Sequence, residues 1–193
     1  MAIDVERIIM DSLLALVEDE GVPLSRVTVK QLLERSGVSR QTFYNHFLDK
    51  NDLIAKVYDR MVISEFDERG DAAEVDFRSS LVASLGRMRA HAAFLSQALR
   101  MTDQNNLTEH AIAHSRAFDL AWHQRLWGSD PMPDELRFAT EYHAMASSYM
   151  VISWVLSGFP VSEEELAGLI ADMRGSGMEC LFEGAETPGN PYA

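Results

Sequence analysis

Cysteine is almost absent from this sequence: Cys180 is the only one among 193 residues. A single thiol cannot form an intrachain disulfide, which suits a protein of a reducing compartment. A lone cysteine in an apolar stretch is most often a small core residue rather than a reactive group, and we interpret Cys180 in that way.

Long hydrophobic runs are also lacking. The most apolar stretch, residues 144–159, contains several serines and is shorter than the roughly 20 apolar residues that a membrane-spanning helix needs. The sequence begins MAIDVERIIMDSLLALVEDEG, with early acidic residues and without the basic segment of a secretory signal peptide. We therefore expect a soluble protein of the cytoplasm.

Positive charge is scarce. The chain has 17 lysine and arginine residues against 30 aspartate and glutamate residues, a net charge of −13. Taken over the whole chain, this balance argues against binding to nucleic acid, because phosphate groups repel an acidic protein. Only a local concentration of basic residues can answer that objection.

Catalytic motifs are missing as well. The sequence has no GxSxG, HExxH, phosphate-binding loop or paired-carboxylate arrangement. We therefore expect neither an enzyme nor a bound cofactor. His110 and His114 have the four-residue spacing that can present two imidazoles to one metal ion, but no third ligand is evident. Solvated or packed histidines are the simpler interpretation, and we expect no metal site.

Helical apolar spacing is what the sequence has in quantity. Apolar residues make up 47% of the chain, enough for a sizeable core. Their spacing follows the helical period throughout, with no convincing strand alternation, and predicts an all-α protein. Beyond an acidic link at 67–76, a helix is expected to begin near Phe77 and to continue through 91–101. Further helices are expected at 107–127, 134–156 and 162–182.

Three helix starts follow one another closely near the N-terminus. An apolar residue before the N-cap and another at the fourth helical position mark such a start, and Thr, Ser and Asp are good N-caps. Gln31 completes a capping box, and Gly37 can end a helix in the left-handed conformation. The spacing predicts a short helix, a glycine turn, a second short helix and a third, at Val27, Thr28 and Leu32, at Val38, Ser39 and Phe43, and at Leu48, Asp49 and Leu53.

The segment 39–47 has an apolar and a polar face. At about 100° per residue, Phe43 and Phe47 point to the core and the opposite side points away from it. The outward side chains suit base edges and phosphates and include no carboxylate: Arg40, Gln41, Thr42, Tyr44 and Asn45. The alternative is a polar face that is only solvated, since helix-turn-helix geometry also occurs in proteins that never touch DNA.

The local charge of this unit answers the objection from the whole chain. Between residues 25 and 50 there are five basic and two acidic residues, a net charge of +3. A basic module on an acidic body is typical of one phosphate-facing domain. The residues alone therefore favour a DNA-binding helix-turn-helix.

Residues 28–53, TVKQLLERSGVSRQTFYNHFLDKNDL, resemble the N-terminal signature of the TetR family of bacterial regulators. The family pattern G-V-S-x-x-T-[FL]-Y-x-H-F-x-x-K-x-x-L is matched at every fixed position from Gly37 to Leu53. The segment 157–170, SGFPVSEEELAGLI, is similar to the C-terminal region of a subset of the family that includes activators of dihydroxyacetone kinase genes.

The resemblance implies about nine helices and a homodimer that binds a palindromic operator. It implies a helix-turn-helix DNA-binding domain at 1–48, a helical ligand-binding and dimerisation domain at 49–182, and a flexible tail at 183–193. The helix at 134–156 is apolar well past one face, so this helix and 162–182 are expected to form the dimer interface. The alternative is burial within one subunit.

The resemblance also implies roles for single residues at the DNA. Thr28, Tyr44 and Lys50 match positions that hold phosphates, and His46 matches a position often near the DNA backbone, a packing or helix-capping role being its alternative. The positions expected to read bases are Ser39, Arg40, Gln41, Thr42 and Asn45.

An effector pocket between the central helices is a further implication. Apolar pockets with a few polar groups are the usual ligand sites, although aromatic residues at helical spacing are also ordinary core. The candidates for binding a small-molecule effector, whose identity these residues do not specify, are Phe94, Phe118, Trp122, Tyr142, Met145 and Tyr149.

Two functions compete on this sequence. The first is a ligand-responsive dimeric repressor that binds a palindromic operator through the helix at 39–47. The second is a transcriptional activator, or a coregulator that does not bind DNA and acts through protein contacts. The acidic body and the segment 157–170 favour the second.

Overall fold

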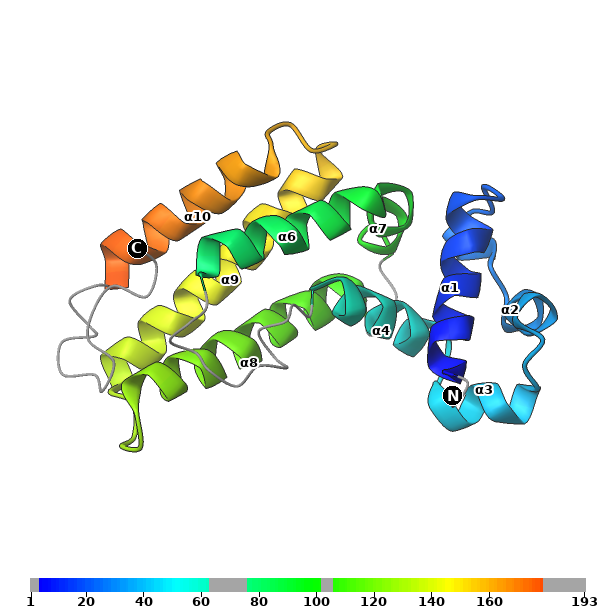
Figure 1. Cartoon of the computed structure of the whole chain (residues 1–193), viewed down its shortest axis with the longest axis horizontal. Coiled ribbons are helices and arrows are strands. Elements are labelled where there is room, and N and C mark those ends of the chain that lie inside the picture. The colour runs from blue at the N-terminus through cyan, green and yellow to red at the C-terminus, as the bar shows by residue number, and fades with distance from the viewer. Residues whose placement is uncertain (1–3, 63–75, 102–105, 179–193) are drawn as a thin grey trace.

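The computed structural model describes residues 4–62, 76–101 and 106–178, and all regular structure within these ranges is helical. The prediction of an all-α fold is confirmed for this part of the chain. It comprises nine α-helices and a short 3-10 helix, η1 (Figure 1): α1 (Val5–Glu18), η1 (Leu24–Arg26), α2 (Val29–Ser36), α3 (Arg40–His46), α4 (Lys50–Val62), α6 (Phe77–Ala90), α7 (Ala92–Ala98), α8 (Leu107–Trp127), α9 (Asp134–Leu156) and α10 (Glu163–Met178).

The three closely spaced helix starts are confirmed by their caps. The Thr28 hydroxyl accepts from the backbone N–H of Gln31, whose side chain accepts in return from the N–H of Thr28, completing the capping box. Ser39 caps α3 by accepting from Thr42 N–H at 3.1 Å, and Asp49 accepts from the N–H of Asp52 at the start of α4. Each side chain satisfies a backbone donor that a helix start leaves free.

Gly37 makes the turn between α2 and α3. Its φ of +68° lies in the left-handed region, where a side chain costs free energy and glycine does not. The turn brings the second helix across the first within three residues, which is the geometry of a helix-turn-helix.

The longer helices match the apolar spacing, with one exception. The helices at 107–127 and 134–156 begin and end where predicted. The segment 91–101 is less helical than predicted, because α7 ends at Ala98 and the chain tightens into i→i+3 hydrogen bonds from Arg100 to Gln97 and from Met101 to Ala98.

Some predictions concern residues outside the described ranges: the link at 67–75, Cys180, the last helix beyond 178 and the tail at 183–193. Among the described residues, no helix is both long and apolar enough to cross a membrane.

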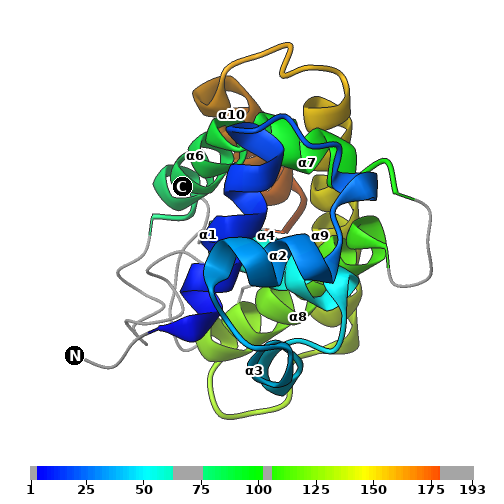
Figure 2. The same cartoon turned by 90° about the vertical axis from the view of Figure 1, so that its right-hand side faces the viewer.

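The helices form an elongated molecule with α1, α2 and α3 at one end (Figure 1). The helices α6, α8, α9 and α10 run along its length, and α4 leads from the terminal group of helices into this bundle. Viewed from that end, α3 lies at the edge of the molecule, away from α10 (Figure 2). The helix predicted to read DNA is therefore at the periphery.

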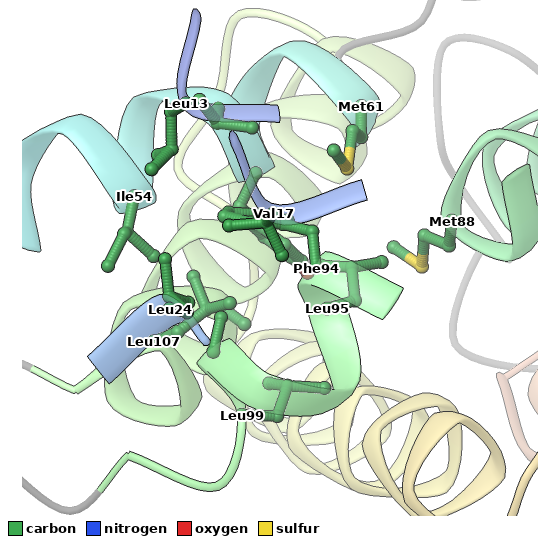
Figure 3. Close-up of a cluster of buried hydrophobic side chains, with 14 of the residues drawn as sticks. Leu13, Val17, Leu24, Ile54, Met61, Met88, Phe94, Leu95, Leu99 and Leu107 are labelled. Atoms are coloured by element: carbon green, nitrogen blue, oxygen red, sulfur yellow. The ribbon is translucent and has the colours of Figure 1, made fainter. Parts of the chain in front are cut away.

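The larger of two apolar clusters in the described residues crosses from the terminal helices into the bundle, and a smaller one lies around Trp122. Leu13 and Val17 of α1 and Leu24 of η1 lie close to Ile54 of α4 and Phe94 of α7 (Figure 3). The same cluster reaches the recognition segment at one end and α9 and α10 at the other. The apolar cluster thus continues from the terminal helices through α4 into the bundle, and the domain boundary at residue 48 stays a prediction.

Buried polar groups join α8, α9 and α10. Arg174 of α10 donates to Asp119 of α8 at 2.6 Å, with 3% and 4% of their side chains exposed. His123 Nδ1 lies 2.7 Å from the Thr140 hydroxyl, which donates to the carbonyl of Leu136. Since the hydroxyl hydrogen is used there, the imidazole donates from Nδ1.

Burial is the main reason that the pKa of His123 is lowered to about 3, with smaller contributions from Arg174 and His143. A histidine in an unfolded chain takes up its proton near pH 6.5. Between these values the unfolded state binds more protons, so the free energy of unfolding falls as the pH falls below about 6.5. From pH 7 to about pH 4.5 we expect this group to cost about 2–3 kcal/mol of stability.

Urea unfolding followed by circular dichroism at both pH values measures this loss. The variant His123→Gln removes the titrating group and keeps an amide that can bond Thr140, so its stability is expected to fall less over the same range. Equal losses in the two proteins would contradict the assignment to His123.

Candidate nucleic-acid interface and central cavity

The orientation of α3 is set by two phenylalanines on its inner side. Phe43 and Phe47 are 0% and 1% exposed, and their rings lie 5.5 Å apart in the core beneath α2. One helical turn separates them, so the opposite side of this short helix faces solvent. Burying the two rings stabilises the helix-turn-helix by about 2 kcal/mol for each ring.

The outward side of α3 carries the predicted base-reading groups. Gln41, Asn45 and Arg40 are exposed, and Thr42 is half-buried. Tyr44 is 44% exposed, packs edge-on against Phe43 and has the Arg40 guanidinium 5.4 Å from its ring centroid. An amide, a phenol and a guanidinium therefore share an accessible surface that has no carboxylate of its own helix.

The hydroxyl groups predicted at the DNA take part in helix caps. Thr28 is exposed and belongs to the capping box of α2. Ser39 is exposed as the N-cap of α3, and its hydroxyl lies 2.7 Å from that of Thr42. Both residues stand where backbone N–H groups open a helix, a position that favours phosphate.

Two lysines of α4 donate hydrogen bonds to backbone carbonyls of the helix-turn-helix and of the turn before it. Lys50 donates from Nζ to the carbonyls of Leu24 and Val27, at 3.2 Å each, in the turn that precedes α2. Lys56 donates to the carbonyl of His46 at 2.7 Å, at the end of α3. Lys50, predicted at phosphate, thus also has a local structural role.

Sequence reasoning missed Lys56. Its ammonium also lies 4.9 Å from the Phe47 ring centroid, a cation–π contact. A lysine can satisfy the free carbonyls at the end of a helix, but here it comes from the next helix, and no local spacing indicates the pairing.

His46 faces α1 rather than solvent alone. Its Nδ1 lies 3.3 Å from Glu6, whose carboxylate is also 3.6 Å from Lys56. This contact corresponds to the packing alternative for His46, and a role at the DNA backbone stays a prediction.

Some of the basic side chains in this domain form ion pairs with acidic residues. Arg35 forms an ion pair with Glu20, and Lys30 lies 3.6 Å from Glu34. Arg26 and Arg40 are exposed. The net excess of positive charge therefore lies towards η1 and α3.

A second feature is a cavity of about 130 Å³ inside the bundle, which we call the central cavity. Residues of α4, α6, α8, α9 and α10 line it. Its apolar lining residues are Phe77, Leu81, Leu85, Met88, Phe118, Val151 and Ile170. Its polar lining residues are Tyr58, Ser80, Ser84, His114, Ser115, Asp119, Ser147, Ser148 and Arg174.

The six candidate ligand residues lie in three different environments. Phe118 lines the central cavity. Phe94 is fully buried in the larger apolar cluster, and Trp122 is buried against Phe77, with which it stacks at 5.6 Å. The other three lie exposed on α9 and do not line the cavity: Tyr142, Met145 and Tyr149.

The polar groups of the central cavity were not found by sequence reasoning. Asp119 and Arg174 are the buried ion pair between α8 and α10, and Arg174 also donates to Ser147 at 3.1 Å. Tyr58 comes from α4, and burial, together with the charge of Asp59, raises the pKa of its phenol well above its usual range. It therefore stays protonated near neutral pH and can donate a hydrogen bond.

The paired histidines of α8 both face α4. His110 Nε2 lies 2.7 Å from Asp59, and His114 Nδ1 lies 3.5 Å from the same carboxylate oxygen. In the described ranges, no three His, Cys, Asp or Glu side chains are arranged to hold a metal ion. The cluster ties α4 to α8 beside Tyr58.

Large apolar side chains are exposed on both helices of the predicted dimer interface. We call this set the outer apolar face. Its members on α9 recur at spacings of three or four residues, so they share one side of the helix. They are Phe138, Tyr142, Met145 and Tyr149 of α9 and Leu169 and Met173 of α10, each more than half exposed.

These features define a class of protein, in which the described part of the chain is all-helical, with a peripheral helix-turn-helix and a bundle that contains a cavity. Residues 9–57 match the model of "Bacterial regulatory proteins, tetR family". No curated protein sequence matches the chain.

Two solved structures share the fold. "Dihydroxyacetone kinase operon activator DhaS" is 16% identical, with a TM-score of 0.65, and the match covers 93% of this chain and 98% of that one. A structure described as a TetR-family transcriptional regulator from Syntrophomonas wolfei str. Goettingen is also 16% identical. Its TM-score is 0.51, and the match covers 89% of this chain and 93% of that one.

Residues 9–57 thus match the model of this family, and the chain as a whole shares the fold of the two solved structures. The resemblance noted in residues 28–53 is confirmed for this N-terminal segment.

The two lysines of α4 can be tested separately. Lys56→Met removes the donor to the last carbonyl of α3, so we expect faster amide hydrogen exchange in α3 and little change in α2. Lys50→Met removes the donors to the turn before α2 and should do the reverse. Each lost hydrogen bond from a charged donor is expected to cost about 1.5–3 kcal/mol of local stability.

Hydrogen exchange read by mass spectrometry measures both effects, and Lys30→Met, on the exposed side of α2, is the matched control. Equal protection of α3 in Lys56→Met and in the unsubstituted protein would show that Lys56 does not hold this helix.

Proposed function

We propose that this protein is a ligand-responsive, dimeric transcriptional regulator that binds a palindromic operator through α3. The observation that carries the proposal is the outward side of α3, where Gln41, Tyr44 and Asn45 are exposed and no carboxylate intervenes. Amides bind adenine edges, and a tyrosine hydroxyl bonds phosphate. The predicted contacts of Thr28, Lys50 and His46 belong to the same proposal.

Dimerisation would pair the outer apolar face with its symmetry mate. Contiguous exposed apolar side chains mark interaction surfaces, and a two-fold axis lets the same residues of each subunit meet in one interface. Such a dimer presents two α3 helices, which suits half-sites about 34 Å or a multiple of that apart. The position of α3 at one end of the elongated molecule supports this geometry (Figure 1).

An effector in the central cavity would act through α4. Tyr58 lines the cavity, and Lys50 and Lys56 of the same helix hold both ends of the helix-turn-helix. A ligand that favours one position of α4 would shift the population between dimers with different spacings of α3. We assign the unliganded form as the DNA-binding state, so that the protein represses in the cytoplasm until its effector arrives.

A second candidate is an activator, or a coregulator that works through a partner protein. The neighbour with a TM-score of 0.65 bears the name of an operon activator, and the segment 157–170 is similar to that subset. Purified protein that shows no salt-sensitive DNA binding would favour the coregulator, because phosphate contacts release counterions and make affinity depend on salt.

The DNA contacts predict a strong effect of two substitutions on α3. Gln41→Ala with Tyr44→Ala removes a base contact and a phosphate contact, at about 1–3 kcal/mol for the base contact alone. We expect binding to the DNA upstream of the protein's own coding sequence to fall to the non-specific level, measured by fluorescence anisotropy. Arg116→Ala, on the exposed side of α8, removes a cation outside the interface and should bind as before.

Circular dichroism and sedimentation would first establish that the double variant is a folded protein of unchanged assembly. Undiminished, salt-sensitive binding by that variant would contradict the assignment of α3.

The dimer proposal predicts that charge on the outer apolar face separates the subunits. Tyr149→Glu with Met173→Glu places carboxylates where two apolar surfaces would meet, and burying them unpaired is unfavourable by several kcal/mol. Sedimentation equilibrium should then give the mass of one chain. Leu48→Glu, at a side chain that is 83% exposed outside this face, is the control and should stay dimeric. A double variant with unchanged mass would place the interface elsewhere.

A further inference from the structure

We infer that the central cavity selects a small, uncharged molecule with one ring that carries a hydroxyl group. This is the class of simple aromatic alcohols and phenols. The inference rests on the proposed function only in that the occupant of the cavity is the effector. Its three grounds are the size of the cavity, the serine hydroxyls in its wall and the pairing of its charges.

The size of the cavity limits the occupant. Its volume is about 130 Å³, close to that of an engineered apolar cavity of about 150 Å³ that takes up benzene. A single ring with one short substituent, roughly six to ten non-hydrogen atoms, therefore fits without expansion of the bundle. A fused or linked set of rings exceeds this volume and would extend through the open side of the cavity.

Hydroxyl groups on two sides of the cavity remain available to an occupant. Ser84 accepts from Arg87 and Ser148 donates to the carbonyl of Ala144, so these two are engaged. Ser80 of α6 and Ser115 of α8 also line the cavity, and the described residues give neither hydroxyl a hydrogen-bond partner. A hydroxyl or carbonyl oxygen of the occupant can bond either group, while its ring packs on the apolar wall.

The ionised groups of the wall neutralise one another. Asp119 and Arg174 pair at 2.6 Å while almost fully buried, and the Arg174 guanidinium also lies 5.0 Å from the Phe77 ring centroid. His114 also lines the cavity, and its Nδ1 lies 3.5 Å from Asp59, which is not a lining residue. A charged occupant would lose its hydration and would have to compete with this existing ion pair, which is unfavourable. The wall therefore favours a neutral molecule over an anion or a cation of the same size.

A set of matched ligands tests the three grounds on the DNA-free protein by isothermal titration calorimetry. Benzyl alcohol, benzoate and benzylammonium differ mainly in charge, and 1-naphthalenemethanol adds a second ring to the alcohol. We expect saturable binding of benzyl alcohol that is at least about tenfold tighter than that of either ion. The naphthalene alcohol should bind more weakly than benzyl alcohol.

Variants assign the binding to this cavity. In Ser80→Ala with Ser115→Ala, we expect benzyl alcohol to bind about fivefold more weakly and toluene, which has no hydroxyl, to bind no more weakly than before. Ser96→Ala, on α7 and outside the lining, is the control. Val151→Phe fills the cavity and should abolish binding of every ligand, whereas Met150→Phe adds the same ring on the exposed side of α9 and should not.

Tighter binding of benzoate or benzylammonium, equal binding of the naphthalene alcohol, or no saturable binding of benzyl alcohol would each overturn the inference. DNA binding by the unliganded protein is measured separately. A protein that binds DNA through α3 but does not bind benzyl alcohol would contradict the ligand class and leave the DNA-binding part of the proposed function intact.

Discussion

The position of α4 is the constraint on which the rest of the structure depends. Its inner side chains belong to the larger apolar cluster, which runs from α1 to α10, so it cannot shift without disturbing both ends of the molecule. At its start, Lys50 and Lys56 reach the backbone on either side of the helix-turn-helix. Farther along, Asp59 meets two histidines of α8 and Tyr58 borders the central cavity. One helix thus connects the outward side of α3 with the interior of the bundle.

This arrangement separates rigid from adjustable parts. The helix-turn-helix is fixed internally by caps, a glycine turn and two buried rings, so it moves as a unit. Close-packed cores respond to added volume by shifting elements rather than by compressing. In the mechanism that we propose, a molecule entering the central cavity would act on the wall to which α4 contributes Tyr58, and the lysines of α4 would transmit a displacement to α3. A fall in pH acts on a different group, because it favours protonation of His123, which is buried between α8 and α9.

Local features were predictable from the sequence. N-caps depend on residues three apart, so Thr28, Ser39 and Asp49 marked three helix starts that the structure confirms. The two faces of α3 follow from the 3.6-residue period and the placement of Phe43 and Phe47. Loops with glycine and proline ended the long helices at the right places.

Features built from distant segments were not predictable in the same way. The central cavity takes its wall from five helices between residues 58 and 174, and no spacing brings those residues together. Helical periodicity does not distinguish a core from an outer surface, which is why Trp122 and Tyr149 were grouped although one is buried and the other exposed. The buried pair of Asp119 and Arg174 is 55 residues apart in the chain. Charged residues are expected at the surface unless a partner is known.

The central claim, that α3 reads DNA for a two-fold dimer, is tested most directly by selecting binding sequences from a random DNA library with the purified protein. The account predicts enrichment of a palindrome whose half-sites are about one helical turn or more apart, with binding that weakens as salt rises. Sequences that show no enrichment after repeated rounds, or an enriched site without two-fold symmetry, would contradict it.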